Sequence, residues 1–275
     1  MLLIVFVHYS ASGNLEKYVK YYVDELLKIE EEKEFVFVST SLLALDDKKI
    51  LMDKGIKVIE RENVGYDFYS YKVGIKSVDL SKFSSVLICN DSVFGPLYDI
   101  NEIYQKLQSN ENDIVGMTQS YEKQYHLQSY FLLFKQKACQ SDLFNEFWNR
   151  VEILNNKDEI IQKYEIGLSQ EFLRNGYSIG AYCNMTTTCI DMVLHSEQKL
   201  KAIKRCIKYF FRGKLKQIKA LNITHYLWEY IIVKKKFPFI KRELIDKNPQ
   251  KLNIAHIDTV IKEYTQYPVE LFQRE

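Results

Sequence analysis

An apolar segment, Val86–Cys89, runs directly into a polar triplet, Asn90-Asp91-Ser92. In open α/β sheets, ligands bind just outside the carboxyl ends of buried strands, where polar side chains of this kind collect. A turn containing glycine, Asn63–Asp67, precedes a helix-like segment a short way upstream. Free N–H groups at the start of a helix attract phosphate. Together the two features predict an α/β protein with a site for a nucleoside diphosphate.

The first part of the chain alternates strand and helix patterns, as a mostly parallel sheet requires. Leu2–His8 is an apolar run, and Leu15–Ile29 has apolar residues at helical spacing. Further on, Gln128–Phe134 predicts a strand, and Glu165–Asn175 predicts a helix closed by Gly176. The predicted fold class is therefore α/β, with a Rossmann-type, mostly parallel central sheet flanked by helices.

Charge is distributed unevenly along the chain. Between Lys199 and Arg242 there are fourteen Lys or Arg and a single acid, Glu229, although the net charge of the whole chain is only +2. Such asymmetry indicates a basic segment that meets an anionic surface. We place a domain boundary near residue 195, between an α/β domain at 1–195 and a basic helical region at 196–275.

Composition restricts the class of protein further. A hydrophobic fraction of 47% is that of a folded globular chain. No apolar run reaches the roughly 18 residues that a membrane-spanning helix needs. The five cysteines are odd in number and lack CxxC spacing, so we expect neither structural disulfides nor a zinc site. The expected location is a reducing cytoplasm.

Six motifs follow one another over most of the chain. They are ENVGYDFYSYKVGI (Glu62–Ile75), LICNDSVFGP (Leu87–Pro96), HLQSYFLLF (His126–Phe134), FNEFW (Phe144–Trp148), YEIGLSQEFLRNGY (Tyr164–Tyr177), and THYLW with PFIKRELIDKNP (Thr224–Trp228, Pro238–Pro249). In this order they resemble the rhamnan synthesis F proteins, which are related to family-2-type glycosyltransferases of the GT-A fold. The resemblance implies a GT-A-like catalytic domain that binds a nucleoside-diphosphate sugar.

The resemblance assigns the triplet Asn90-Asp91-Ser92 to the nucleotide-sugar site. In GT-A enzymes the strand ends here in an Asp-x-Asp motif whose carboxylates hold Mg²⁺ or Mn²⁺ against the diphosphate. Within this triplet only Asp91 is acidic. Asp91 is therefore either a catalytic ligand to a weakly bound metal, or cationic side chains hold the diphosphate instead. The alternative for the triplet is a local Asx-turn at the strand end.

The glycine turn takes a role from the same resemblance. Asn63, Gly65 and Asp67 occupy the place of an element that contacts the nucleotide, because glycine permits close approach of the backbone. Lys72, one helical turn on, would reach a phosphate as a point charge. The alternative, from the residues alone, is an ordinary turn with a helix cap, followed by a lysine exposed to solvent.

Glu165 matches the acidic position that supplies the catalytic base in inverting GT-A enzymes. A carboxylate there takes the proton of the acceptor hydroxyl as that hydroxyl attacks the anomeric carbon. The alternative is an acid that is merely favoured in the first turn of a helix. Glu171 lies nearly two turns further on and is expected to face elsewhere.

Two other polar clusters are expected beside the cleft. His8 and Tyr9 end the first strand, where a GT-A fold seats the nucleobase, and Tyr9 would stack on it. Strand alternation predicts that His126, Gln128 and Tyr130 share one face, and the resemblance implies that this face binds the acceptor. The alternative for His126 is a structural role.

The resemblance implies transfer of a sugar, L-rhamnose or another deoxyhexose, with inversion, to a lipid-linked oligosaccharide of a capsule, O-antigen or rhamnan. The basic segment would dock on the anionic inner face of the plasma membrane, in a complex with other polysaccharide-synthesis enzymes. The incomplete acidic motif leaves a non-catalytic sugar-binding or scaffold partner as the alternative. Nucleic acid is not an expected partner, because no nucleic-acid module accompanies the basic residues. The basic segment taken alone leaves two alternatives, a nucleic-acid-binding protein and a solvated helix face.

Overall fold

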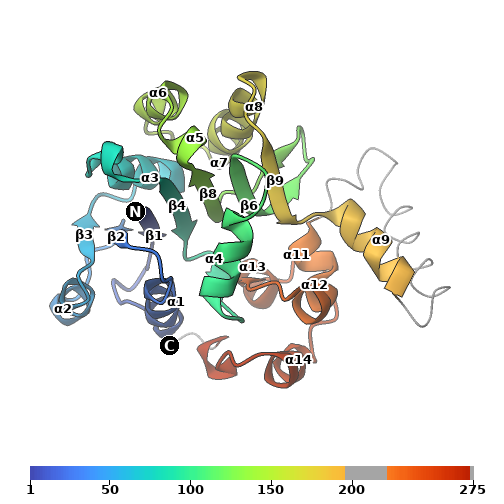
Figure 1. Ribbon diagram of the computed structural model, residues 1–275. Coiled ribbons are helices and arrows are strands. Elements are labelled where there is room, and N and C mark those ends of the chain that lie inside the picture. Colours follow the sequence, from blue (N-terminus) through green and yellow to red (C-terminus); the bar gives the residue numbers. More distant parts are fainter. Residues whose placement is uncertain (196–221, 273–275) are drawn as a thin grey trace.

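The computed structural model describes residues 1–195 and 222–272. Helices cover both faces of a central sheet (Figure 1). The strands of this sheet are β1 (Leu2–His8), β2 (Lys33–Ser39), β3 (Lys57–Glu60), β4 (Ser85–Asn90), β6 (Ile114–Ser120), β7 (His126–Leu127), β8 (Phe131–Lys135) and β9 (Ile179–Cys183).

The eight strands of the described sheet follow the order β3-β2-β1-β4-β8-β6-β7, and β9 pairs with β6. The neighbours β3, β2, β1 and β4 are parallel. Strand β8 runs antiparallel to β4 and β6, and β7 runs antiparallel to β6, so these two alone oppose the others in the described sheet. The predicted fold class, an α/β protein with a mostly parallel central sheet, is confirmed.

The sequence of β1 explains why both faces of the sheet are covered. Leu2, Ile4 and Phe6 belong to one buried cluster, whereas Leu3 and Val5 belong to a second cluster on the opposite face. A strand that is apolar on both faces must be buried on both sides.

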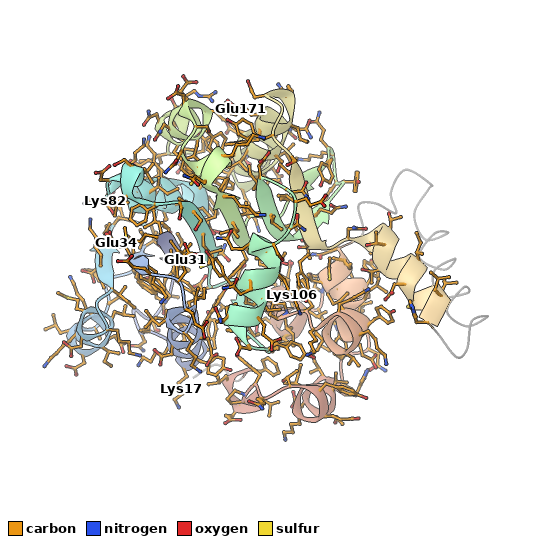
Figure 2. The ribbon with its side chains drawn as sticks, in the orientation of Figure 1. Lys17, Glu31, Glu34, Lys82, Lys106 and Glu171 are labelled. Carbon is orange, nitrogen blue, oxygen red and sulfur yellow. The ribbon has the colours of Figure 1, made fainter. Side chains whose placement is uncertain are left out.

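Two sets of helices supply this cover, and Figure 2 draws the side chains that they carry. The first face packs against α1 (Lys17–Leu27), α4 (Ile100–Gln108), α9 (Met185–His195), α11 (Ile223–Tyr226), α12 (Trp228–Lys235) and α14 (Ile257–Tyr264). The second face packs against α3 (Tyr66–Lys76), α5 (Gln136–Cys139), α6 (Asp142–Arg150) and α8 (Gly167–Arg174). Helix α2 (Leu45–Asp53) adds Leu51 to the first face. None of the helices in the described ranges is long and apolar enough to cross a membrane.

Two glycines fix helix α3 at the carboxyl end of the sheet. Gly65 precedes the helix with φ of +73°, a left-handed conformation that favours glycine. Gly74 allows α3 to lie close on β1, because a Cβ atom at this position would stand 2.4 Å from a methyl carbon of Val5. The first turn of α3 is therefore held beside the end of β4.

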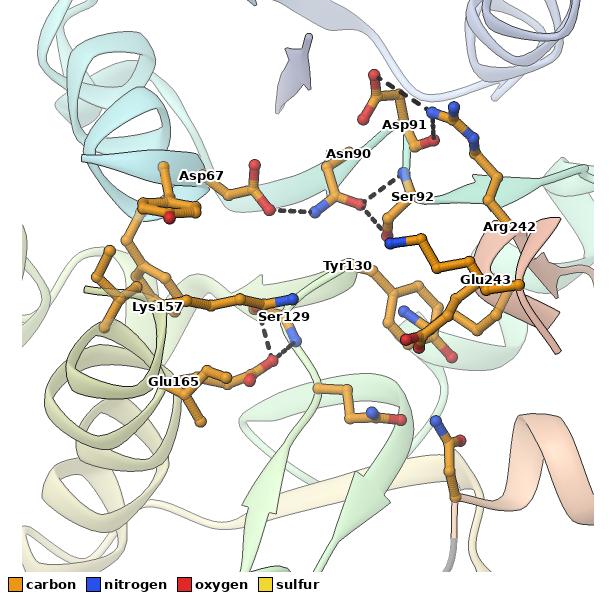
Figure 3. Close-up of a pocket in the computed structure, with 18 of the residues that line it drawn as sticks. Asp67, Asn90, Asp91, Ser92, Ser129, Tyr130, Lys157, Glu165, Arg242 and Glu243 are labelled. Carbon is orange, nitrogen blue, oxygen red and sulfur yellow. Dashed lines mark hydrogen bonds and ion pairs between the residues drawn. The ribbon is translucent and has the colours of Figure 1, made fainter. Parts of the chain in front are cut away.

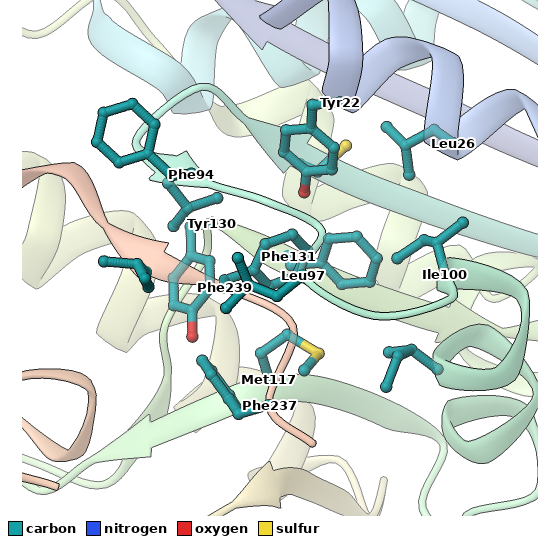
Figure 4. Packing of buried hydrophobic residues seen from close by; sticks show 14 of the residues in the cluster. Tyr22, Leu26, Phe94, Leu97, Ile100, Met117, Tyr130, Phe131, Phe237 and Phe239 are labelled. Carbon is teal, nitrogen blue, oxygen red and sulfur yellow. The ribbon is translucent and has the colours of Figure 1, made fainter. Parts of the chain in front are cut away.

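The described part of the C-terminal region packs on the first face of the sheet. Strand β10 (Ile240–Lys241) pairs antiparallel with β5 (Val93–Phe94). The ring of Phe239 lies 5.3 Å from that of Tyr22 and 5.2 Å from that of Phe131, between centroids (Figure 4). The predicted boundary near residue 195 therefore does not separate two cores. The predicted membrane-docking segment, residues 199–221, lies outside the described residues.

Candidate active site

The polar triplet lies at the end of β4, and a cavity of about 430 Å³ opens beside it (Figure 3). Side chains reach this cavity from the start of α3, the end of β4, the segment between β7 and β8, the region before α8, and the start of the C-terminal helix α13 (Arg242–Asp246). The charged and polar side chains around it include Asp67, Asn90, Asp91, Ser92, Gln128, Ser129, Lys157, Glu165, Lys241, Arg242 and Glu243.

A second cavity, of about 460 Å³, shares Tyr66, Asp67 and Asp91 with the first. The rings of Tyr9 and Tyr66 at this second cavity are 50% and 46% exposed. Its other lining residues are Thr40, Asn63, Val64, Gly65 and Asn155. The cleft therefore has two compartments that meet at Asp67 and Asp91, and the glycine turn and the triplet both line it.

Asp91 lies between a backbone amide and a guanidinium. Its Oδ2 accepts the N–H of Tyr9 at 3.0 Å and lies 3.9 Å from Nη1 of Arg242. The same Nη1 donates to the carbonyl oxygen of Asp91 at 3.2 Å. Burial raises the pKa of the Asp91 carboxyl, while His8, the Tyr9 amide and Arg242 act in the opposite direction. Asp91 is thus a partly buried carboxylate beside the guanidinium of Arg242.

Asn90 connects the triplet to α3. Its Nδ2 donates to Oδ2 of Asp67 at 2.8 Å, and its Oδ1 accepts from the N–H and the Oγ of Ser92 at 3.1 and 2.6 Å. The Asx-turn alternative therefore describes Asn90 itself. Burial raises the pKa of Asp67 to about 6, and the negative charges of Asp91 and Glu165 add to this effect.

Glu165 faces the first cavity from a π-helical turn, Ile161–Ile166, which connects α7 (Lys157–Ile160) to α8. Its Oε1 accepts from the backbone N–H and from Oγ of Ser129, at 2.7 and 2.8 Å. The sequence placed Glu165 in the first turn of an α-helix, which is wrong. Single π-helical turns occur frequently at functional sites.

Lys241 and Arg242 bring positive charge to the opposite side of the cavity. Nζ of Lys241 lies 3.4 Å from the ring centroid of Tyr130, a cation–π geometry. Burial lowers the pKa of Lys241 to about 7, although Glu165 and Asp67 oppose this change. Sequence reasoning missed both residues. The signal was present in the motif PFIKRELIDKNP, whose two adjacent cations stand where α13 begins.

Two residues predicted at the nucleotide site do not line either cavity. Nζ of Lys72 donates to the carbonyl oxygens of Asn149 and Val151, at 3.0 and 2.7 Å, so it ties α3 to the end of α6 and does not face the cleft. His8 is completely buried, and its ring nitrogens contact a serine of β2 and a glutamate before α1. His8 acts on the site by favouring a lower pKa of Asp91 and through its carbonyl oxygen, which accepts the N–H of Thr40 at 3.0 Å.

The strand predicted at Gln128–Phe134 is interrupted, because β7 stops before Gln128 and β8 starts after Tyr130. Alternation fails across this break. Gln128 and Tyr130 line the first cavity, but His126 is buried outside it, with Nδ1 2.8 Å from the carbonyl oxygen of Gln124. The prediction that His126 shares their face is wrong.

The residues around Asp91 do not fit a resident divalent ion. Mg²⁺ demands about six oxygen ligands in octahedral geometry. Oδ2 of Asp91 is already hydrogen-bonded to Tyr9 and lies beside the Arg242 guanidinium, and Oδ2 of Asp67 is bonded to Asn90. Over residues 1–195 and 222–272, no group of three or more His, Cys, Asp and Glu side chains is arranged to hold a metal. This arrangement fits an anionic ligand better.

A central sheet with a charged, two-compartment cleft at the ends of its parallel strands defines a ligand-binding α/β protein of the Rossmann type. A sequence profile described as rhamnan synthesis protein F matches residues 35–231. The chain belongs to the rhamnan synthesis protein F family, and the predicted resemblance is confirmed.

Two relatives show how far the similarity extends. The chain is 31% identical over 197 residues to virulence protein VirA of Vibrio anguillarum, covering 70% of this chain and 62% of VirA. It is 30% identical over 152 residues to protein y4gN of Sinorhizobium fredii, covering 53% of this chain and 40% of y4gN. The chain thus spans less than two thirds of the length of either relative.

Solved structures are similar at a lower level. An active-site mutant of LgtC matches 98% of this chain and 98% of its own, with a TM-score of 0.43 and 12% identity. Residues 1–349 of S. aureus TarS match 96% of this chain and 90% of their own, with a TM-score of 0.43 and 13% identity. Similarity at this level establishes neither activity nor substrate.

Proposed function

We propose that the protein is a glycosyltransferase that moves a sugar from a nucleoside-diphosphate sugar to a hydroxyl of a growing bacterial surface polysaccharide. One observation carries this proposal: Asp67, Asp91 and Glu165 converge with Lys241 and Arg242 on one cavity at the strand ends. Membership of the rhamnan synthesis F family supports the substrate class, L-rhamnose or another deoxyhexose.

The two compartments divide the nucleotide sugar between them. The second cavity takes the nucleoside, because the half-exposed rings of Tyr9 and Tyr66 offer stacking surfaces and Asn63 offers an amide to the base or ribose. The diphosphate lies where the compartments meet, beside Asp91 and Arg242. The sugar then extends into the first cavity, towards Glu165.

Glu165 acts as the general base in this proposal. The acceptor oxygen forms a bond to the anomeric carbon, and the bond from that carbon to the diphosphate oxygen breaks. The electron pair leaves with the nucleoside diphosphate, and the acceptor proton passes to Glu165. Ser129 holds Oε1 of this carboxylate through two hydrogen bonds, so Oε2 is the atom available for the proton. Attack opposite the leaving group inverts the anomeric configuration.

The acceptor is a lipid-linked oligosaccharide on the inner face of the plasma membrane, where the protein binds peripherally beside other polysaccharide-synthesis enzymes. Ile190 and Leu194, one turn apart on α9, are 54% and 63% exposed and precede the basic segment that starts at Lys199. Exposed apolar side chains followed by lysines are typical of a surface that docks on anionic lipid. Residues 1–195 carry the carboxylates, and 196–275 supply docking and two active-site cations.

The test incubates the purified protein with dTDP-, UDP- and GDP-sugars, with and without Mn²⁺, and measures released nucleoside diphosphate together with thermal stability. One class of nucleotide sugar is expected to stabilise the protein, by ~2.7 kcal/mol at a concentration of one hundred times its Kd. The same nucleotide sugar should be cleaved, with release of its nucleoside diphosphate. Failure of every nucleotide to bind would contradict the proposal. Binding without release, even with lipid-linked acceptor present, would establish the non-catalytic sugar-binding alternative instead.

A further inference from the structure

We propose that Lys241 and Arg242 hold the diphosphate of the nucleotide sugar in place of a divalent metal ion, and that Lys241 takes up a proton as the nucleotide binds. This inference rests on the proposed function, because it assigns the cation at the same cleft. It identifies which groups neutralise the charge that develops on the leaving nucleoside diphosphate.

The guanidinium of Arg242 is fixed before any ligand arrives. Nη1 donates to the hydroxyl of Tyr18 and to the carbonyl oxygen of Asp91, and Cζ lies 4.9 Å from the ring centroid of Tyr18. Nε lies 3.9 Å from the carboxylate of Asp246. A planar guanidinium restrained in this way is suited to phosphate oxygens and loses little side-chain entropy on binding.

Lys241 is held by different contacts. It pairs with Val93 in the short β10–β5 ladder, and its Nζ lies over the ring of Tyr130. The charged groups that act on it come from four elements, and they are Asp67 of α3, Lys157 of α7, Glu165 of the π-helical turn and Glu243 of α13. The ammonium group thus lies at a cavity in which acids outnumber bases.

The protonation of Lys241 is therefore sensitive to a bound anion. Burial lowers the pKa of Lys241 to about 7, so Lys241 is neutral in most molecules at a pH slightly above 7. A diphosphate nearby favours the charged form and raises that pKa again. When the glycosidic bond to the diphosphate breaks, its electron pair adds one negative charge to the leaving group. Lys241 and Arg242 then stabilise this charge as cations held in place beside the diphosphate.

Isothermal titration calorimetry tests the inference with UDP, dTDP and GDP at pH 8, in two buffers that differ in ionisation enthalpy, with EDTA or with Mn²⁺. For the nucleotide that binds, the affinities measured with EDTA and with Mn²⁺ are expected to agree within about twofold. Binding should be accompanied by the uptake of nearly one proton. Lys241→Met should lower the affinity ten- to a hundredfold and abolish the uptake. Lys241→Arg should retain most of the affinity and also lose the uptake, because arginine is charged throughout.

Two controls separate the inference from other sources of the same signal. Asp67→Asn should preserve the proton uptake at pH 8, because a carboxyl with a pKa of about 6 is already ionised there. Lys234→Met, at an exposed position of α12, should change neither affinity nor uptake. Binding that requires Mn²⁺, or uptake that persists in Lys241→Arg, would overturn the inference and leave the proposed transferase intact. Absence of binding under both conditions would overturn the proposed function itself.

Discussion

The two sides of the cleft are built in opposite ways. The acidic side, Asp67, Asp91 and Glu165, comes from the first 195 residues and is held by hydrogen bonds from backbone N–H groups and short polar side chains. The basic side, Lys241 and Arg242, comes from a two-residue strand and the helix after it, and is held against two tyrosine rings.

This difference shows that the acidic side alone is a poor site for an anion. Its carboxylates lie close enough that Asp91 and Glu165 both raise the pKa of Asp67. In the proposed function a diphosphate is accommodated because the C-terminal segment brings Lys241 and Arg242 to the same cavity. Nucleotide binding should therefore depend on contacts in the first-face core, and chemistry should depend on Glu165.

The largest expected effect is on the acidic side. Glu165→Gln removes the proposed base, so the transfer rate should fall by about 10²–10⁴-fold. Nucleotide affinity should change far less than the transfer rate, because Glu165 is bonded to Ser129 and acts on Lys241 only through its charge. Steady-state rates and calorimetry on the same preparation measure both quantities. Glu171→Gln, at a glutamate paired with Arg150 outside both cavities, is the matched control. Equal losses in the two variants would remove Glu165 as the base.

Substitutions in the core test whether nucleotide affinity depends on the packing of the C-terminal segment. Phe239→Ala and Phe144→Ala each remove a buried ring, one from the first face and one from the second, and each should cost about 3–5 kcal/mol of unfolding free energy. Only Phe239 immediately precedes the strand that carries Lys241. Nucleotide affinity, measured where both variants are folded, should therefore fall only in Phe239→Ala. A similar fall in both would show that docking is not the cause.

The acidic side also predicts a dependence of stability on pH. Because the pKa of folded Asp67 is raised from 3.8 to about 6, the folded protein binds this proton more tightly than the unfolded chain. The stabilisation is complete below pH 4 and is lost as the pH rises through about 6. Asp67→Asn should remove this loss. The free energy of unfolding of the variant, relative to that of the unaltered protein, should therefore be about 1–3 kcal/mol higher at pH 8 than at pH 4. Urea unfolding of both proteins at the two pH values measures it, and parallel pH profiles would refute it.

The smallest expected effect concerns the turn that holds the acidic side. Gly65→Ala places a Cβ atom at φ of +73° and 2.8 Å from Cβ of Tyr69, so it should cost more than the roughly 1–2 kcal/mol of left-handed strain. Gly55→Ala has φ of +77° with no atom within 4 Å, and should cost only that strain. Urea unfolding gives both values. Equal costs would show that the packing of Gly65 on α3 is unimportant.

Patterns within short segments of the sequence predicted those parts of the candidate site that lie at the end of a strand or at a turn. The apolar run that ends at Asn90 and the glycine turn at Gly65 each specify their own element, and parallel strands bring their carboxyl ends together. Glu165 was found through a motif, although the π-helical turn around it carries no simple periodic signal.

The remainder depended on contacts that sequence patterns do not record. Lys241 reaches the cavity because a two-residue strand pairs with Val93, a contact across most of the chain. The predicted positions of His126 and Lys72 do not match the structure for a related reason. His126 was assigned by alternation, which the break before Tyr130 destroys, and Lys72 by helical spacing, which does not reveal the carbonyl oxygens near it.

A crystal structure of the protein with a bound nucleoside diphosphate tests the central claim most directly. The account predicts a nucleoside beside Tyr9 and Tyr66, with its diphosphate against the guanidinium of Arg242 and directed towards Glu165. Density for the nucleotide outside this cleft, in a protein shown by calorimetry to bind it, would contradict the account.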